Sequence, residues 1–402
     1  MRRNISRFGG MILCIIFITA SGTRADDLPI KIFGYFQTEL RQDNDSGNPS
    51  NSFLLQQLNL FLQRDLAKDW VSFVNFEIVN SYSSFRDWGS FNLEEAWVSY
   101  RSSDQFKIKV GLQIPEFNNL NTIKNRSPLL PYIIRPVIYE ASFGEFINLD
   151  LLTPTRAYTQ IYGSIPSHGI KFDYAGYIGN SGDIRTSQQV RTSSRNSGQQ
   201  SGVDTTNGNM VGMRLGIRYS GLKAGFSTTH EKSNTFVGVA NYFKEPASRY
   251  DYVPLVRLGT DLSYNWKDFS LEGEYLSTRF TREIASGLNV KAEFFYVTLG
   301  YYFNDHLFLY GSISELNIDE FGIRVDSVNP PNDTVYSGYD IKTEVSLPTV
   351  GFSYSLNDRL TFKGQVLLAN IDEKRSEPRN SVVFYRSRRD LDRYALAVSA
   401  FF

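Results

Sequence analysis

The sequence predicts an all-β chain that closes into a transmembrane antiparallel β-barrel of about sixteen strands. Alternating segments of about ten residues recur from one end of the chain to the other, and their connections alternate between short and long. Beyond residue 25, no apolar run reaches the roughly 18 residues of a transmembrane helix. A chain without such a run can cross a bilayer only as a closed barrel, because every backbone polar group must be paired within the hydrocarbon.

The amino terminus has the pattern of a secretory signal peptide. Three arginines precede an apolar run at residues 11–20, and they are Arg2, Arg3 and Arg7. The small-x-small sequence at 23–25 predicts a signal peptide at 1–25, with 20–22 as the alternative cleavage site. The only cysteine, Cys14, lies in this segment. The mature chain at 26–402 therefore has no disulfide scaffold and no thiolate metal site.

Removal of the signal segment changes the charge balance. The segment holds four basic and no acidic residues, so 42 basic and 42 acidic residues become 38 and 42, a net charge of −4. This balance disfavours nucleic acid as a partner. No nucleotide-binding loop or redox motif stands out, and we expect no cofactor.

The alternating segments can be placed in order along the chain. They lie near 30–42, 53–64, 70–81, 91–101, 105–113, 156–164, 168–177, 209–219, 222–231, 254–265, 269–282, 290–303, 306–317, 343–355, 359–371 and 391–402. In the fifth of these segments, Phe106 and Val110 lie on one face of the expected strand. Lys107 and Lys109 lie on the other. This pattern predicts lipid outside the barrel and water inside it.

The connections differ in length in a regular way, and the short ones lie at 102–104, 220–221, 304–305 and 356–358. Short turns of such barrels face the periplasm and long loops face outward, so both termini are expected on the periplasmic side. Two long connections, 183–209 and 372–390, are predicted to be external loops, and 183–209 is expected to be solvated, with a binding role as the alternative. The loop at 372–390 holds six basic and four acidic residues, and it either contacts anionic lipopolysaccharide, attracts anions or is an ordinary charged loop. A soluble β-sandwich or propeller would also have many short strands, but neither requires this asymmetry.

The last segment ends the chain on an aromatic residue. Its apolar face carries Tyr394, Leu396, Val398, Ala400 and Phe402. This pattern resembles the carboxy-terminal signal of bacterial outer-membrane barrels, which the barrel-assembly machinery reads. We therefore expect that machinery as a partner, and we expect the last strand to pair with the first, since an open edge beside exposed aromatics would favour aggregation.

The longest connection, about 114–155, is predicted to form the constriction of a pore. Its prolines stiffen it and oppose strand pairing. It carries both cations and carboxylates. The predicted pore-lining and constriction residues are Lys107, Lys109, Glu116, Lys124, Arg126, Arg135, Glu140, Glu145, Arg156, Arg214 and Arg218.

Several stretches resemble the porin O and P group of phosphate-selective porins. The similar stretches are EEAWVSY at 94–100, KVGLQIPEF at 109–117, the proline-bounded run at 131–136 and Gly34-Tyr35-Phe36. The resemblance implies a sixteen-stranded barrel whose third external loop folds into the lumen, and an anion-selective pore with a lysine cluster and an arginine ladder.

The presumed lumen faces of this chain carry charges of both signs. The cations are Lys107, Lys109, Arg156, Lys171, Arg214, Arg218, Arg257, Lys363 and Arg393. The carboxylates are Glu39, Glu77, Glu95, Asp173, Asp261, Glu272 and Glu274. Charges of both signs at a constriction would set a transverse field that filters solutes by charge and dipole.

These observations together predict a porin of the bacterial outer membrane that lets small hydrophilic solutes or ions diffuse passively, with anion preference left open. The three histidines, His168, His230 and His306, are expected too far apart for a metal site or a catalytic dyad, and we expect no enzyme activity. A structural or adhesin barrel and a barrel hydrolase are the alternatives. Outer-membrane lipid, lipopolysaccharide and small hydrophilic solutes or anions are the expected partners, and a homotrimer is left open.

Overall fold

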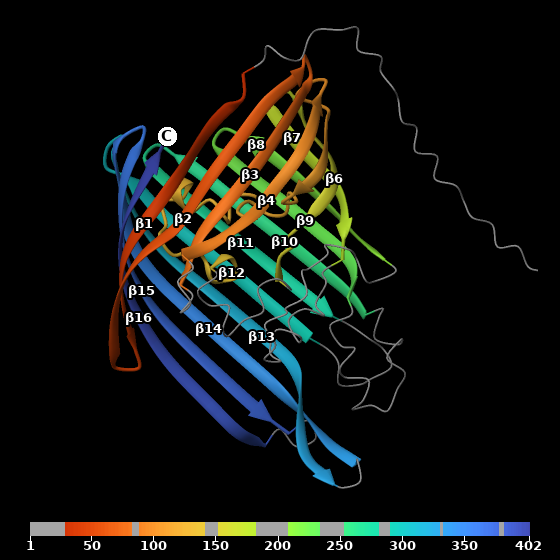
Figure 1. Ribbon diagram of the computed structural model, residues 1–402, viewed down its shortest axis with the longest axis vertical. Coiled ribbons are helices and arrows are strands. Elements are labelled where there is room, and N and C mark those ends of the chain that lie inside the picture. Colours follow the sequence, from red (N-terminus) through yellow and green to blue (C-terminus); the bar gives the residue numbers. More distant parts are fainter. Residues whose placement is uncertain are drawn as a thin grey trace, which may run out of the picture.

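The structure is a computed structural model that describes residues 29–82, 88–140, 152–181, 208–233, 253–280, 290–329, 333–377 and 382–402. The predicted signal peptide lies outside the described residues. Figure 1 shows strands inclined to the long axis of a barrel, with the carboxy terminus at one end of it. No helix in the described ranges is long and apolar enough to cross a membrane.

Sixteen strands in the described ranges form one closed antiparallel barrel, in which each strand pairs with its chain neighbours and β1 pairs with β16. The strands are β1 (Lys31–Asp45), β2 (Asn48–Ala67), β3 (Trp70–Tyr82), β4 (Trp88–Arg101), β5 (Lys107–Gln113), β6 (Ala157–Ser167), β7 (Ile170–Asn180), β8 (Asn209–Tyr219), β9 (Leu222–Ser233), β10 (Val253–Trp266), β11 (Phe269–Phe280), β12 (Val290–Tyr302), β13 (Leu307–Asn329), β14 (Asp333–Asn357), β15 (Leu360–Ser376) and β16 (Val383–Phe401). Two short 3-10 helices, η2 (Ser127–Leu129) and η3 (Val137–Tyr139), lie between β5 and β6. The prediction of a sixteen-stranded barrel is confirmed.

The barrel closes at the two ends of the chain. Tyr35 on β1 is the register partner of Phe401 on β16. The Gly34 amide donates to the Phe402 carbonyl over 2.9 Å, and the Phe402 amide donates back to the Gly34 carbonyl over 3.0 Å. The last residue thus completes the ladder, and no sheet edge is left between β1 and β16.

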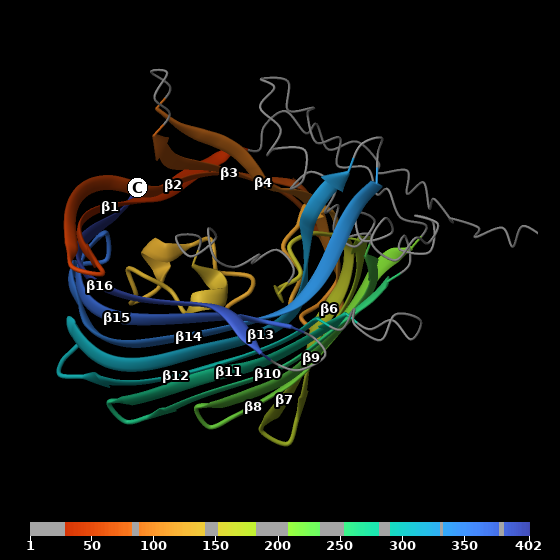
Figure 2. The same ribbon diagram turned by 90° about the horizontal axis from the view of Figure 1, so that it is seen from below.

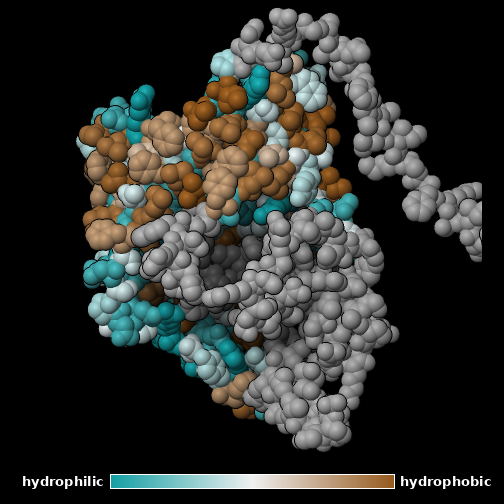
Figure 3. Space-filling view, viewed as in Figure 1, coloured by the Kyte–Doolittle hydropathy of each residue, from teal (hydrophilic) through white to brown (hydrophobic). Residues whose placement is uncertain are grey.

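Alternation along the strands separates an outer from an inner face. On β8, the outward Val211 and Leu215 are 55% and 51% exposed, whereas the inward Met210 and Arg214 are buried. Figure 3 shows hydrophobic residues gathered in a band across the strands, with hydrophilic residues beyond that band at the end of β14 to β16. The two faces match the predicted lipid and lumen sides.

Short turns join strands at the end of the barrel where both β1 begins and β16 ends. In the turn between β8 and β9, Ser220 and Gly221 have φ angles of 44° and 84°, and His168 and Gly169 between β6 and β7 have 49° and 82°. Two successive residues with positive φ are the geometry of the tight hairpin turns that match the twist of paired strands.

At the opposite end, four strands extend further than predicted. β13 and β14 run for 23 and 25 residues and form the long hairpin of Figure 1. The interpretation of 372–390 as a loop is wrong for most of its length, because β15 continues to Ser376 and β16 begins at Val383. The added lengths of β15 and β16 carry polar residues on both faces at 372–376 and 386–390, so the apolar alternation that marks the other strands is missing there. The predicted loop at 183–209 lies almost wholly outside the described residues.

Candidate functional site

The segment that follows β5 folds into the barrel and crosses its lumen. Figure 2 looks along the barrel and shows this segment inside the ring of strands. We call residues 114–140 the inner loop. It exchanges hydrogen bonds with β2, β4, β9, β11, β12, β13 and β15. The predicted constriction loop is therefore inside the lumen over its described part, and residues 141–151 lie outside the described residues.

One side of the inner loop is apolar and packs against the inner wall of β11 to β16. The buried loop residues are Phe117, Leu120, Leu130, Tyr132, Ile133, Ile134, Val137, Ile138 and Tyr139. The wall residues they join include Leu276, Phe294, Tyr296, Phe308, Tyr310, Leu316, Leu347, Leu367 and Leu391. Because the inner faces of these strands are apolar here, the loop has a hydrophobic core within the barrel.

Polar side chains of the wall fix the loop backbone. The Gln365 Oε1 atom accepts from the amides of Ile133 and Ile134 over 2.7 and 2.9 Å, and its Nε2 atom donates to the Ile134 carbonyl over 2.9 Å. The buried Lys363 Nζ atom donates to the Ser127 and Pro128 carbonyls over 3.0 and 3.2 Å. These bonds satisfy loop backbone groups that the barrel shields from water.

Glu274 on β11 holds the loop at two further points. One carboxylate oxygen accepts from the amides of Asn119 and Leu120 over 2.9 and 2.7 Å, and the other accepts from the Tyr139 hydroxyl over 2.6 Å. Burial raises the pKa of the Tyr139 hydroxyl well above its ordinary value. The tyrosine therefore stays protonated and acts as a donor.

Two β-bulges aim consecutive polar residues at the loop. The register of β1 and β2 shifts at Gln37, so that Gln56 and Gln57 both reach the loop, where Gln56 donates to the Ile133 carbonyl over 2.8 Å. A second shift between β3 and β4 leaves Glu94 and Glu95 beside Asn125 and Arg126 in the same way. A bulge re-aims side chains that strict alternation would send to opposite faces.

The predicted cations of the loop are held in contacts within the protein. Arg126 pairs with Glu95 at 2.7 Å, and Arg135 pairs with Glu140 at 3.4 Å. Lys124 is buried and donates to the Thr153 hydroxyl over 3.0 Å. The structure therefore gives Lys124, Arg126, Arg135 and Glu140 a part in fixing the loop, while Glu145 lies outside the described residues.

The inner wall of β5 to β9 carries the more exposed cations. Lys171, Arg218 and Lys223 are direct cross-strand partners on β7, β8 and β9. Arg218, whose side chain is 45% exposed, binds Asp173 at 2.5 Å. These three like charges lie directly opposite one another and repel. Together they create a local positive potential near the end of the barrel where the short turns lie.

Lys107 and Lys109 extend this wall onto β5. Lys107 pairs with Asp104 at 3.0 Å. The Lys109 Nζ atom lies 4.5 Å from the centroid of the Trp97 ring and 5.4 Å from that of Tyr162, in cation–π contact with both. We call Lys107, Lys109, Lys171, Arg218 and Lys223 the basic wall.

Glu116 is the carboxylate of the inner loop that faces the basic wall. Its amide and side chain both bond to Gln160 on β6, over 3.3 and 3.2 Å. Burial raises the pKa of Glu116 above its ordinary value, while the charges of Lys109, Arg214 and Lys223 act in the opposite direction.

The remaining predicted pore residues have different settings. Arg214 is buried and pairs with Asp261 at 2.5 Å, so its charge is balanced within the wall. Arg156 precedes β6 and is exposed. Arg257 with Glu231, and Arg393 with Asp43, form further ion pairs of the inner wall at 2.8 and 2.6 Å.

The three histidines lie apart from one another. His168 and His306 are in turns between strands, and His306 contacts the Ser355 carbonyl over 2.8 Å. His230 is exposed on β9. Among the described residues, no group of three or more His, Cys, Asp or Glu side chains is arranged to hold a metal ion.

The predicted assembly residues lie on the outer face of β16. Tyr394, Leu396 and Phe402 are 46%, 57% and 57% exposed, whereas the intervening Ala395 and Ala397 are buried. Their recognition by the assembly machinery stays a prediction.

The closed sixteen-stranded barrel and the loop that folds into its lumen together define a fold of the outer-membrane porin type. No family model matches the sequence, and no curated protein matches it. Solved structures of similar fold include an anion-selective porin from Comamonas acidovorans, with a TM-score of 0.55, 12% identity and coverage of 94% of this chain and 100% of that one.

Two other solved structures are similar to the same degree. The outer membrane channel DcaP of Acinetobacter baumannii has a TM-score of 0.52 and 11% identity, covering 93% of this chain and 97% of that one. OmpT, an outer membrane protein of Vibrio cholerae in a trimer form, has a TM-score of 0.53 and 9% identity, and the match covers 93% of this chain and 99% of that one. At such identities the likeness concerns the fold, so the resemblance to the porin O and P group stays a prediction.

Proposed function

We propose that this chain is a passive diffusion channel for small hydrophilic solutes or ions, and that the inner loop is its constriction. The observation that carries the proposal is the inner loop itself, which crosses the lumen and is anchored on both sides of it. A barrel of sixteen strands is wide enough for an aqueous channel. A loop fixed by a hydrophobic core and by buried hydrogen bonds narrows such a channel to a defined size.

We further propose a modest preference for anions. The basic wall has five cations, and the carboxylates beside it are Asp104, Glu116 and Asp173, so the group has a net charge of +2. Charges in a narrow passage act through a lower effective dielectric than bulk water and are less screened by salt. Anions therefore gain more than cations along this wall.

The opposite side of the lumen is acidic. A hollow of about 640 Å³ lies between the inner loop and the wall of β11 to β16, and its lining includes three carboxylates and one lysine, which are Glu272, Asp305, Asp358 and Lys363. Basic and acidic walls on opposite sides set up a transverse field. Such a field orients dipolar solutes, which suits small hydrophilic molecules carrying both charges.

The test is ion selectivity in a planar bilayer. Replacing Lys107, Lys171 and Lys223 by glutamine removes three charges from the basic wall. A unit charge about 4 Å away contributes about 1 kcal/mol in water, so we expect the anion-to-cation permeability ratio to fall roughly two- to fivefold. The zero-current potential in a salt gradient measures this ratio.

A matched control removes three cations from the outer face, at Lys342, Lys374 and Arg386. It should leave the ratio nearly unchanged. If the control shifts selectivity as much as the wall variant does, the basic wall is not the filter. If the wild-type barrel shows no conductance at all, the channel proposal fails, and a structural or adhesin barrel becomes the better reading.

We propose no catalytic activity, because the three histidines lie apart from one another and the contact of the His168 Nδ1 atom with the Ser167 Oγ atom, over 3.0 Å, lies in an exposed turn. A homotrimer is also part of the proposal, since the outer face of β4 exposes large apolar side chains such as Phe91 and Leu93, which are 65% and 44% exposed. The mass of the folded complex in native mass spectrometry gives the number of chains directly.

A further inference from the structure

The outer face of β11 to β16 carries a row of charged residues toward the end of the barrel remote from the short turns. Each member is the register partner of the next across six neighbouring strands. In strand order the row is Arg279, Lys291, Asp319, Lys342, Lys374 and Arg386, and we call it the outer basic row. Five of its six members are cations.

The next outward row, two residues closer to the centre of the barrel, carries three carboxylates and one cation, and we call it the acidic row. It contains Ser277, Glu293, Asn317, Glu344, Asp372 and Arg388. Pairs form between the rows, such as Lys342 with Glu344 at 2.8 Å and Arg386 with Asp372 at 2.7 Å.

These ion pairs leave the basic groups accessible. The Lys342 and Arg386 side chains are still 52% and 57% exposed, so their donor groups can reach an external anion. Lys342, Lys374 and Arg386 also stand directly opposite one another, and like charges in that position repel. An anion bound along the row would relieve this repulsion.

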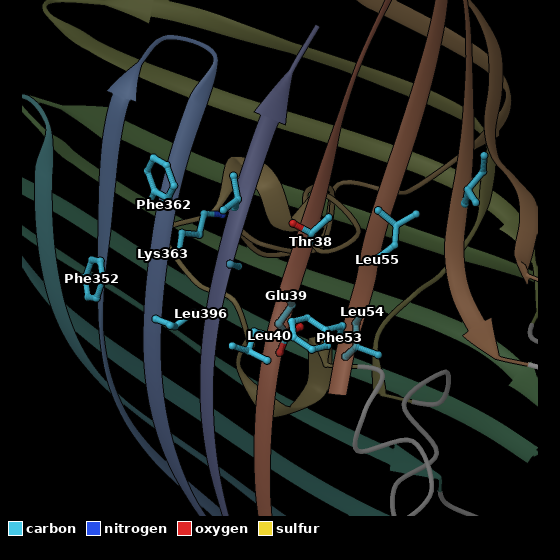
Figure 4. A pocket seen from close by; sticks show the side chains of 13 residues that line it. Thr38, Glu39, Leu40, Phe53, Leu54, Leu55, Phe352, Phe362, Lys363 and Leu396 are labelled. Carbon is cyan, nitrogen blue, oxygen red and sulfur yellow. The ribbon is translucent and has the colours of Figure 1, made fainter. Parts of the chain in front are cut away.

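A groove lies on the same outer face, on the side of the rows toward the short turns. Two adjoining hollows of about 860 and 530 Å³ share Leu40, Phe352 and Leu396 in their linings. Figure 4 shows the larger hollow, where Phe352, Phe362 and Leu396 face Leu40 and Phe53 across β14, β15, β16, β1 and β2. We call the two hollows the outer groove.

The spacing between groove and rows fits a lipid. Val366 lies in the lining of the smaller hollow, and Lys374 of the outer basic row is eight residues further along β15. Eight residues span about 26 Å along a strand and about 20 Å along the axis of a barrel with strands tilted by about 40°. One leaflet with its headgroup region is also about 20 Å thick.

We propose that this face binds lipopolysaccharide, with an acyl chain in the outer groove and phosphates on the outer basic row. Six neighbouring strands spaced about 4.8 Å apart make the row about 24 Å wide. A phospholipid presents one phosphate, which would meet only one or two of the five cations. Lipopolysaccharide carries several phosphates on one molecule, and its divalent counterions can bridge to the acidic row. This inference does not depend on which solute the pore conducts.

The experiment counts lipids on the folded barrel. The protein is extracted from outer membranes in mild detergent, and bound lipopolysaccharide per chain is measured by native mass spectrometry. Exchanging Lys342, Lys374 and Arg386 for glutamine should lower the amount of lipopolysaccharide bound per chain at least about threefold, because exposed basic side chains add to the attraction for an anionic lipid surface. A control that exchanges the exposed turn residues Lys68, Lys267 and Arg359 for glutamine should bind as much lipopolysaccharide per chain as the wild type.

A second variant tests the groove without changing charge. Tryptophan at Val350 and Leu396 fills the hollows, and tryptophan is tolerated on lipid-facing strands. It should also lower bound lipopolysaccharide, and added phosphatidylglycerol should not replace the lost lipid.

Three results would overturn the proposal. The first is equal lipopolysaccharide content in wild type and both variants. The second is equal retention of phosphatidylglycerol, which would mean that any anionic lipid serves. The third is a change from trimer to monomer in the groove variant with lipopolysaccharide unchanged, which would assign the groove to a second copy of the chain.

Discussion

Single buried polar residues decide where the inner loop sits, because each of them meets loop backbone groups that water does not reach. Gln365, Lys363 and Glu274 together bind carbonyls or amides at six loop residues. A buried amide left without its acceptor costs about 1–3 kcal/mol. The loop is therefore held by specific bonds as well as by its apolar side.

Glu116 gives the pore a charge that responds to pH. Because burial raises its pKa, this carboxylate becomes neutral at a higher pH than an exposed glutamate does. Protonation removes one negative charge from beside Lys109, Arg214 and Lys223, with Asp173 as the nearby carboxylate that remains. We therefore expect anion preference to increase as the pH falls, and the zero-current potential measured at stepped pH should show it.

The variant Glu116→Gln is the control for this titration. It should show the stronger anion preference already at neutral pH and should lose the part of the pH response that protonation of Glu116 causes. An unchanged pH profile in this variant would mean that another carboxylate carries the effect.

At the scale of elements, sequence alternation predicted the strands where lipid lies on one side and water on the other. β8 begins and ends where expected, at 209–219. The extensions of β15 and β16 were not predicted, because both faces are polar at 372–376 and 386–390 and cross-strand ion pairs such as Arg386 with Asp372 replace apolar alternation. The bulges were missed too, although the doubled residues Gln56-Gln57 and Glu94-Glu95 mark them.

The inner loop shows a second limit of the sequence. Its position inside the barrel was predicted from its length, its prolines and a family resemblance. Its cations were expected to line the pore, yet Arg126 and Arg135 pair with Glu95 and Glu140. Which carboxylate meets which cation depends on how the loop crosses the lumen, and a single sequence has no local pattern that encodes it. The doubled polar residues and the inward Gln365 were the only available signals for the anchoring side chains.

The hydrophobic core of the inner loop makes a testable prediction about docking. Phe117 is fully buried in that core. Replacing a buried phenylalanine by alanine costs about 3–5 kcal/mol. Here the change weakens the packing of the loop against the wall, because the strands of the barrel are held together by their own backbone hydrogen bonds. Phe117→Ala should thus raise single-channel conductance and expose residues 114–140 to protease in a barrel that is still folded.

The matched control is Phe303→Ala, since Phe303 is 60% exposed in the turn between β12 and β13. Its conductance and protease pattern should equal those of the wild type. Unchanged conductance in Phe117→Ala, with the loop still protected, would show that the polar anchors alone hold the loop.

At the scale of the whole molecule, closure joins the two ends of the chain. An aromatic row runs across the inner face at the closing seam, with Phe401 against Tyr35 at 5.9 Å and Tyr35 against Phe61 at 5.3 Å between ring centroids. On the outer side, a Cβ atom at Gly34 would lie 2.8 Å from the Phe402 ring and closer still to the Asn59 carbonyl oxygen, so glycine allows the close approach at this seam. The first and last strands therefore fit each other on both faces.

Closure makes the last two residues important for assembly. Deleting Phe401 and Phe402 removes the two reciprocal backbone hydrogen bonds with Gly34 and the ring contact with Tyr35. It also exposes unpaired backbone groups of β1 to hydrocarbon, where each costs several kcal/mol. We expect a large loss of folded, heat-modifiable protein in the outer membrane, measured by the gel shift on heating.

The single change Phe402→Ala separates closure from recognition, because it keeps the backbone bonds and removes only the outward ring. If the assembly machinery reads that ring, as the carboxy-terminal pattern predicts, this variant should insert slowly in cells but fold normally from urea into lipid vesicles. The deletion should fail in both settings, since its defect lies in the barrel wall. Normal insertion of Phe402→Ala in cells would show that the assembly machinery does not read this ring. Normal folding of the deletion variant would show that β1 and β16 pair without the last two residues.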